Sequence, residues 1–90
     1  MPLTKTLTIC NTKGLHARAS AQFVETVERF DASATVRRDG QSVAGDSIMG
    51  LLMLAAANGS QIEVSTNGNE AEALMQALES LITDGFGEES

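Results

Sequence analysis

Apolar and polar residues alternate along four short stretches of the chain, which is the pattern of β-strands with one buried face. These stretches are residues 3–9, 33–38, 41–44 and 61–66. Asp39 and Gly40 separate the second stretch from the third, and both residue types tolerate the positive φ angles of a tight hairpin turn. The pattern therefore predicts four strands, of which the middle two form a hairpin.

Three other stretches carry apolar residues at spacings of three and four, which predicts helices with one apolar face. The first helix begins at about His16, the second covers 48–57 behind Ser47 as N-cap, and the third follows Asn69 as N-cap. Gly85 is expected to end the third helix, and 88–90 to form a frayed acidic tail. The expected inward-facing residues are Phe23, Val24, Val27 and Phe30, then Ile48, Leu51, Leu52 and Ala55, then Ala71, Leu74, Leu78 and Leu81.

The predicted order is strand, helix, strand, strand, helix, strand, helix, and each strand has one apolar and one polar face. Such strands suit an antiparallel sheet that is covered by helices on one side and by water on the other. We therefore expect the α+β class: an open-faced, two-layer sandwich in which three helices cover one face of a four-stranded antiparallel sheet. Residues 1–90 are expected to form a single domain.

Composition excludes several classes of function. The formal net charge of −6 argues against binding to nucleic acid or to anionic membranes. The chain has no apolar run long enough to span a bilayer and begins without the apolar segment of a signal peptide, so we expect a cytoplasmic protein. One cysteine and one histidine can form neither an internal disulfide nor a usual zinc site, and no metal or cofactor is expected. Cys10 is expected to be a buried, inert residue at a strand end.

His16, the one histidine of the chain, lies where the first helix is predicted to begin. A helix N-terminus presents unpaired N–H groups and partial positive charge, here from Ala17 and Arg18, and this favours a bound anion. The guanidinium of Arg18 adds donors suited to phosphate oxygens. Because phosphoryl transfer depends mainly on positioning and electrostatic stabilisation, these groups suit that chemistry. A purely structural role for His16, as a loop or capping residue, remains the alternative at this point.

Two motifs in the chain resemble the signatures of one family. Gly14-Leu15-His16-Ala17-Arg18 resembles the active-site motif of the histidine-containing phosphocarrier proteins (HPr) of the bacterial phosphotransferase system, and 46–50 resembles their second signature. The resemblance extends over essentially the whole chain, including the order of the elements. The segments 51–54, 61–64 and 85–86 look more like the nitrogen-related branch, NPr, than like the sugar branch.

The resemblance implies a phosphoryl carrier rather than a full enzyme. In the family, enzyme I hands a phosphoryl group to Nδ1 of the histidine that matches His16, and this phosphohistidine passes it to a IIA protein. Arg18 matches the arginine that steadies the phosphoryl group, beside the backbone of Ala17. Ala19 stands where most members have proline, which would stiffen the first helical turn, so the resemblance implies a more mobile loop here.

A second site is implied at Ser47, which matches the serine that HPr kinase/phosphorylase modifies in some lineages. The segment after it docks enzyme I and IIA proteins in the family, and we expect Met49 and Met53 to be exposed there. For Ile48 and Leu52, packing in the core is at least as plausible as partner contact. The expected protein is a monomer. The alternative function is that of a non-catalytic regulatory binding protein acting through this Ser47–Met53 helix face; a self-contained hydrolase would lack a second catalytic group.

Overall fold

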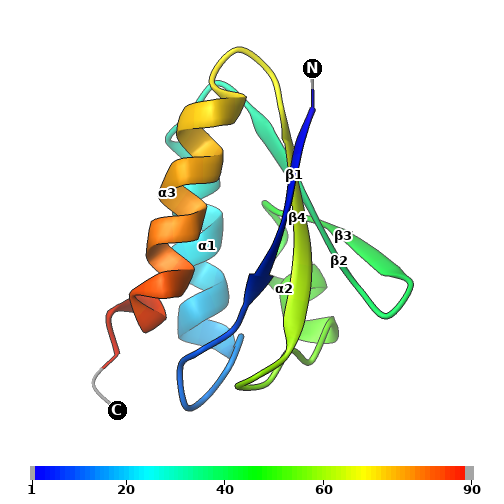
Figure 1. Ribbon diagram of the computed structural model, residues 1–90, viewed down its shortest axis with the longest axis vertical. Coiled ribbons are helices and arrows are strands. Elements are labelled where there is room, and N and C mark those ends of the chain that lie inside the picture. Colours follow the sequence, from blue (N-terminus) through cyan, green and yellow to red (C-terminus); the bar gives the residue numbers. More distant parts are fainter. Residues whose placement is uncertain (1, 89–90) are drawn as a thin grey trace.

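The computed structural model describes residues 2–88, and its elements follow the predicted order with one short addition (Figure 1). The predicted strands and helices are all present within one or two residues of their expected limits, except for the second helix. The elements are β1 (Leu3–Thr8), α1 (Ala17–Glu28), β2 (Ser33–Arg38), β3 (Gln41–Ala44), α2 (Ile48–Met53), β4 (Gln61–Asn67), α3 (Ala71–Thr83) and the 3-10 turn η1 (Gly85–Gly87).

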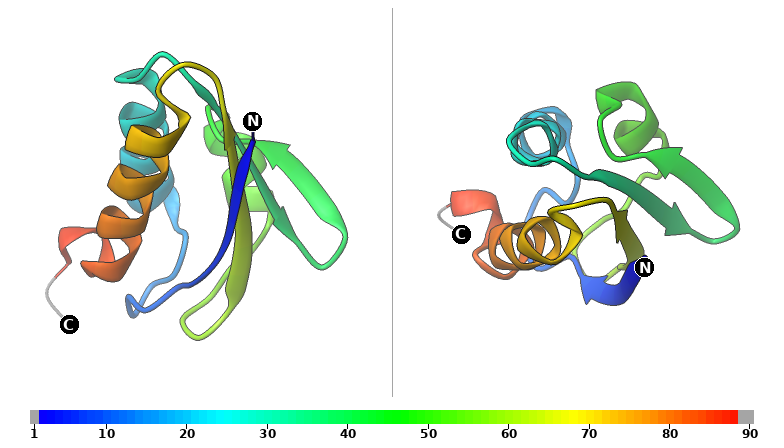
Figure 2. Two further views of the ribbon diagram at one scale, coloured as in Figure 1. Left: turned by 45° about the horizontal axis from the view of Figure 1, so that its top comes forward. Right: turned by 90° about the horizontal axis from the view of Figure 1, so that it is seen from above.

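The four strands form one antiparallel sheet in the order β1-β4-β2-β3, so β1 and β3 are its edge strands. The three helices lie on the same side of this sheet (Figure 2, right), which confirms the open-faced two-layer sandwich. The hairpin between β2 and β3 turns at Asp39 and Gly40, whose φ angles are 50° and 82°. Both values are positive, as the predicted turn requires.

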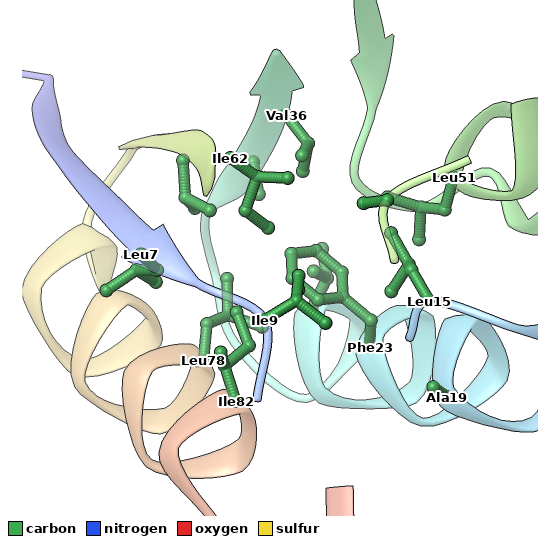
Figure 3. Close-up of a cluster of buried hydrophobic side chains, with 14 of the residues drawn as sticks. Leu7, Ile9, Leu15, Ala19, Phe23, Val36, Leu51, Ile62, Leu78 and Ile82 are labelled. Atoms are coloured by element: carbon green, nitrogen blue, oxygen red, sulfur yellow. The ribbon is translucent and has the colours of Figure 1, made fainter. Parts of the chain in front are cut away.

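The core lies between the sheet and the helices, where the strands contribute alternate side chains (Figure 3). The register sets Leu7 of β1 opposite Ile62 of β4, and Val36 of β2 opposite Val64 of β4, all on the helix side. Phe23 of α1 is fully buried against this layer. Phe30, which was expected in the core, lies beyond the end of α1 and is only partly buried, as is Leu81.

The second helix is shorter than predicted, because it ends at Met53 instead of Ala57. Ala55 adopts a left-handed conformation (φ 52°), which turns the chain back so that Leu54 and Ala56 become buried. The inward residues are consequently Leu51 and Leu54, whereas Ile48 is exposed and Ala55 faces solvent. A turn at 58–59, where we would expect the end of a helix over 48–57, lies well after the observed helix and does not cap it.

Two smaller expectations were wrong. The N-cap of α3 is Glu70 rather than Asn69, and both side chains bind the loop after α1: Glu70 Oε1 accepts the Asp31 N–H (2.7 Å) and Asn69 Nδ2 donates to Asp31 Oδ2 (2.8 Å). Cys10 is exposed rather than buried, and its Sγ donates to the Ile82 carbonyl. Leu3 also lies at the exposed end of its strand.

Within residues 2–88, no helix has the length and apolar character needed to cross a membrane.

Candidate functional site

The loop between β1 and α1 is fixed by a close approach of two backbones. Gly14 has a φ of 66°, and its N–H donates to the Asn11 carbonyl at 3.1 Å. The next N–H, that of Leu15, donates to the Ala56 carbonyl at 2.8 Å, which ties the loop to the segment behind α2. A Cβ atom at position 14 would lie 2.5 Å from that carbonyl oxygen, so both the conformation and the contact require glycine. This contact places the start of α1.

His16 is the N-cap of α1 and has extended backbone angles, φ −81° and ψ −174°. Its carbonyl accepts the N–H of Ser20 at 2.8 Å, while its side chain makes no capping hydrogen bond to the helix. No described side chain therefore caps the first turn, where the N–H groups of Ala17 and Arg18 lie at the positive end of the helix dipole. Both residues are exposed, as an anion-binding turn requires.

A cleft of about 560 Å³ opens in front of this turn. Its lining residues come from the loop, the start of α1 and the end of the chain: Lys13, His16, Ala17, Arg18, Gln22, Phe86, Gly87 and Glu88. The predicted phosphate-binding residues therefore share one cleft with the imidazole, together with a second cation, Lys13. No pattern in the sequence indicated a role for Lys13.

Glu88 enters this cleft, although it was expected in a frayed tail. Its Oε2 is hydrogen-bonded to Nε2 of His16, and its Oε1 accepts a hydrogen bond of 3.1 Å from Nδ2 of Asn11. The hydrogen bond from His16, followed by that from Asn11, lowers the pKa of the Glu88 carboxyl. Residues 89–90 lie outside the described part of the chain.

One local signal for this placement existed in the sequence. Phe86 stands between two glycines, and in the structure all three residues have positive φ, with Phe86 buried at 2% exposure. An apolar side chain in such a flexible setting indicates a segment that folds back onto the domain. Asn11, 4% exposed, carried no comparable signal.

The second predicted site is at the start of α2, none of whose residues lines the cleft. Ser47 is the N-cap of α2, as predicted, and its Oγ accepts the N–H of Gly50 at 3.0 Å. Met49 and Met53 are exposed by 69% and 68%, as expected, and Ile48 by 40%. Leu52 is half-buried. The exposed apolar side chains of α2 (Ile48, Met49 and Met53) are called the α2 face below.

Comparison with known proteins supports this description of the chain. A family model described as "PTS HPr component phosphorylation site" matches residues 3–84. The chain is 45% identical over 86 residues to the phosphocarrier protein HPr of Neisseria meningitidis serogroup A, covering 96% of this chain and 97% of the relative. It is 37% identical over 90 residues to the phosphocarrier protein NPr of Escherichia coli K12, covering 99% and 100%.

The fold is also that of a solved family member. The crystal structure of HPr from Thermoanaerobacter tengcongensis superposes with a TM-score of 0.93 at 38% identity, over 98% of this chain and 99% of that one. The match to an NPr over the full length agrees with the predicted likeness to the nitrogen-related branch. The chain belongs to the HPr family of phosphocarrier proteins of the bacterial phosphotransferase system, which carry phosphoryl groups on a histidine and are not themselves enzymes.

Proposed function

We propose that His16 accepts a phosphoryl group from phospho-enzyme I and passes it to a IIA protein. The observation that carries this proposal is the position of the imidazole. His16 lies at the uncapped first turn of α1, on the wall of a cleft that also contains the cations Lys13 and Arg18. Its side chain is 26% exposed, which leaves it open to a partner while its orientation is restrained.

The groups around the ring suit the demands of the transfer. A phosphoryl group on Nδ1 would have its oxygens near the N–H groups of Ala17 and Arg18 and near the Arg18 guanidinium. These donors stabilise negative charge without supplying a proton, and phosphoryl transfer needs little more than such positioning. A carrier must also release the group, and an exposed cleft with no Ser, Thr or Cys side chain among its described lining residues suits release to another protein.

The experiment is phosphorylation by enzyme I with phosphoenolpyruvate, followed by intact-mass measurement. The wild-type chain should gain one phosphate that is labile in acid and stable in base, as expected for a phosphohistidine. His16→Ala should gain none while keeping the wild-type circular dichroism spectrum. Transfer onward is measured by adding a IIA protein and following loss of the phosphate. A wild-type chain that stays unphosphorylated with active enzyme I would contradict the proposal.

We also propose that Ser47 is a regulatory phosphorylation site. Its Oγ already accepts the Gly50 N–H, so a phosphate there would meet the N-terminal end of α2 without unfolding it. The added charge would lie beside the α2 face, where desolvating it against an apolar partner surface is unfavourable. HPr kinase/phosphorylase with ATP should add one acid-stable phosphate to the wild type and none to Ser47→Ala, and phospho-Ser47 protein should accept phosphoryl groups from enzyme I more slowly. Equal labelling of both chains would remove Ser47 from the proposal.

The α2 face is the proposed contact with enzyme I and the IIA protein. Met49→Asp should weaken enzyme I binding about tenfold, because a carboxylate would have to lose water on docking. The matched control is Thr8→Asp on the exposed, helix-free face of the sheet, which should leave the dissociation constant unchanged. Both constants are measurable by isothermal titration calorimetry. Equal binding by the two variants would place the contact elsewhere.

A further inference from the structure

The imidazole of His16 is held at one nitrogen only. Nε2 is hydrogen-bonded to Oε2 of Glu88, whereas Nδ1 has no hydrogen-bond partner among residues 2–88. A neutral imidazole carries its proton on one nitrogen and a lone pair on the other. A carboxylate can only accept, so the proton must lie on Nε2 and the lone pair on Nδ1.

Glu88 is itself held in place by Asn11. The Nδ2 group of Asn11 donates to Oε1 of Glu88 at 3.1 Å and to the Gly14 carbonyl at 2.8 Å. Since both partners are acceptors, the amide must point its nitrogen at them, and its orientation is unambiguous. Both oxygens of Glu88 are therefore engaged, one by each of two residues in the β1–α1 loop.

The contact between Asn11 and Glu88 leaves a buried polar atom of Asn11 without a partner among residues 2–88, and this cost in stability indicates more than a chance surface contact. Oδ1 of Asn11 is buried and has no partner among the described residues, which by itself destabilises the fold. Glu88 is only 19% exposed, and the buried Phe86 two residues earlier anchors its segment to the domain. Lys13, the other charged group acting on Glu88, favours its ionised form as well.

We propose that Glu88, held by Asn11, is a positioning residue that keeps His16 in the Nε2-protonated form and so presents an unprotonated Nδ1 to the incoming phosphoryl group. This inference rests on the proposed function of His16 and adds two residues to it. In other active sites, too, a carboxylate accepts a hydrogen bond from one ring nitrogen of a histidine. This bond fixes the tautomer and leaves the other nitrogen unprotonated.

The step balances without a further reactant. The lone pair of Nδ1 forms the new bond to phosphorus, while the bond between phosphorus and the donor histidine of enzyme I breaks and its electron pair returns to that nitrogen. The proton stays on Nε2, so the phosphorylated ring carries positive charge next to the Glu88 carboxylate. That carboxylate strengthens its hydrogen bond at the moment the charge forms.

The test is Glu88→Gln, which keeps the shape of the side chain and removes its charge. Its matched control is Glu72→Gln in the first turn of α3, at the opposite end of that helix from the cleft. Two quantities are measured for each: the nitrogen chemical shifts of the His16 ring, which report the position of the proton, and the rate of phosphorylation by phospho-enzyme I. The urea midpoint of each variant verifies that it is folded.

We expect Glu88→Gln to move the ring nitrogen shifts toward those of free histidine and to slow phosphorylation about three- to tenfold, as befits one partly exposed charge-assisted hydrogen bond. Glu72→Gln should change neither quantity. Asn11→Ala should shift the ring nitrogens in the same direction as Glu88→Gln, because Glu88 would lose one of its two anchors.

The outcomes separate this inference from the function on which it rests. If wild-type His16 is phosphorylated but Glu88→Gln matches Glu72→Gln in both shifts and rate, the positioning role is wrong and the carrier function stands. If the ring shifts respond to Glu88→Gln but enzyme I never phosphorylates His16, the control of the tautomer stands and the proposed function fails. A slower rate with unchanged ring shifts would also overturn the inference, since the effect would then not act through the position of the proton.

Discussion

Arg18 illustrates how a single side chain acquires its role from its place in a helix. It is the second residue of α1, exposed, and lines the cleft beside His16. Its charge therefore adds to the positive end of the helix dipole at the point where a phosphoryl group would lie. Among the described residues Arg18 makes no ion pair, so its guanidinium charge is not neutralised by a neighbouring carboxylate in the cleft.

Arg18→Ala should slow phosphoryl transfer about tenfold and leave the free energy of unfolding within about 0.5 kcal/mol of the wild type, because an exposed side chain is removed. Rapid-quench kinetics with phospho-enzyme I and urea denaturation measure the two quantities. The matched control is Arg29→Ala at the opposite end of α1, which should leave the transfer rate unchanged. If the two variants transfer equally fast, Arg18 is not part of the site.

Glu88 should titrate at lower pH than an ordinary glutamate, because hydrogen bonds from His16 and Asn11 favour its ionised form and place its pKa below the usual 4.5. A folded-state pKa below that of the unfolded chain stabilises the folded contact above about pH 4.5 and loses this contribution as the pH falls through the lowered value. Acidification through the lowered pKa should therefore weaken the contacts of the Glu88 carboxyl with His16 and Asn11.

Carbon NMR of the glutamate carboxyl groups checks this directly. The Glu88 midpoint should lie below those of exposed glutamates such as Glu72, and His16→Ala should raise it toward them. A Glu88 midpoint that does not move in His16→Ala would show that the imidazole is not the source of the shift.

At the scale of elements, the site depends on segments that are separate in the sequence and meet through their backbones. The β1–α1 loop is attached to the segment after α2 by the hydrogen bond between Leu15 and Ala56, and Gly14 makes that approach possible. The left-handed turn at Ala55 brings Ala56 into position for the contact. The end of α2 is thus part of what fixes the first turn of α1.

Gly14→Ala should destabilise the domain by about 2–4 kcal/mol, because the new Cβ combines left-handed strain with a clash against the Ala56 carbonyl. Gly59→Ala is the matched control: its φ is also positive, but nothing lies within 4 Å of the added atom, so only the strain of about 1–2 kcal/mol remains. Urea denaturation measures both. Equal losses would indicate that the loop moves away from Ala56 to accommodate the methyl group.

At the scale of the whole molecule, the helices and the sheet are joined by a core that reaches from one edge strand to α2. Phe23 is central to it: the ring is fully buried and lies among the inward residues of the sheet (Figure 3). With a radius of gyration of 11.6 Å, the domain is small, and one large side chain accounts for a considerable part of its apolar burial.

Phe23→Ala should lower the free energy of unfolding by about 3–5 kcal/mol, a large share of the 5–15 kcal/mol typical of domains. Phe30→Ala, which removes the same side chain from the partly buried position after α1, should cost less than half as much. Chemical denaturation monitored by circular dichroism provides both values. A loss for Phe30→Ala as large as that for Phe23→Ala would mean that position 30 belongs to the core after all.

Local features of the sequence determined much of this structure. Strand faces follow from a period of two residues, and the alternation within the four predicted stretches places Leu7, Val36 and Ile62, all buried in the structure, on the apolar faces of their strands. The hairpin at 39–40 and the N-cap at Ser47 depend on the conformational preferences of one or two residues. The start of α1 behind His16 as N-cap could likewise be predicted from local sequence, because the period of the apolar pattern changes there.

The remaining features depend on contacts between distant residues, which no local pattern encodes. The predicted length of α2 was wrong, because the burial of Leu54 and Ala56 outweighs continuation of the helix. These two side chains can be buried only once α1 and the sheet are in place. Glu88 is separated from His16 by 72 residues, so its carboxylate looked like part of a solvated tail. The sequence by itself identified the imidazole, its neighbours Ala17 and Arg18, and the helix that carries them. Only the tertiary structure decided that Glu88 holds the ring, because two segments far apart in the chain must pack together before this contact exists.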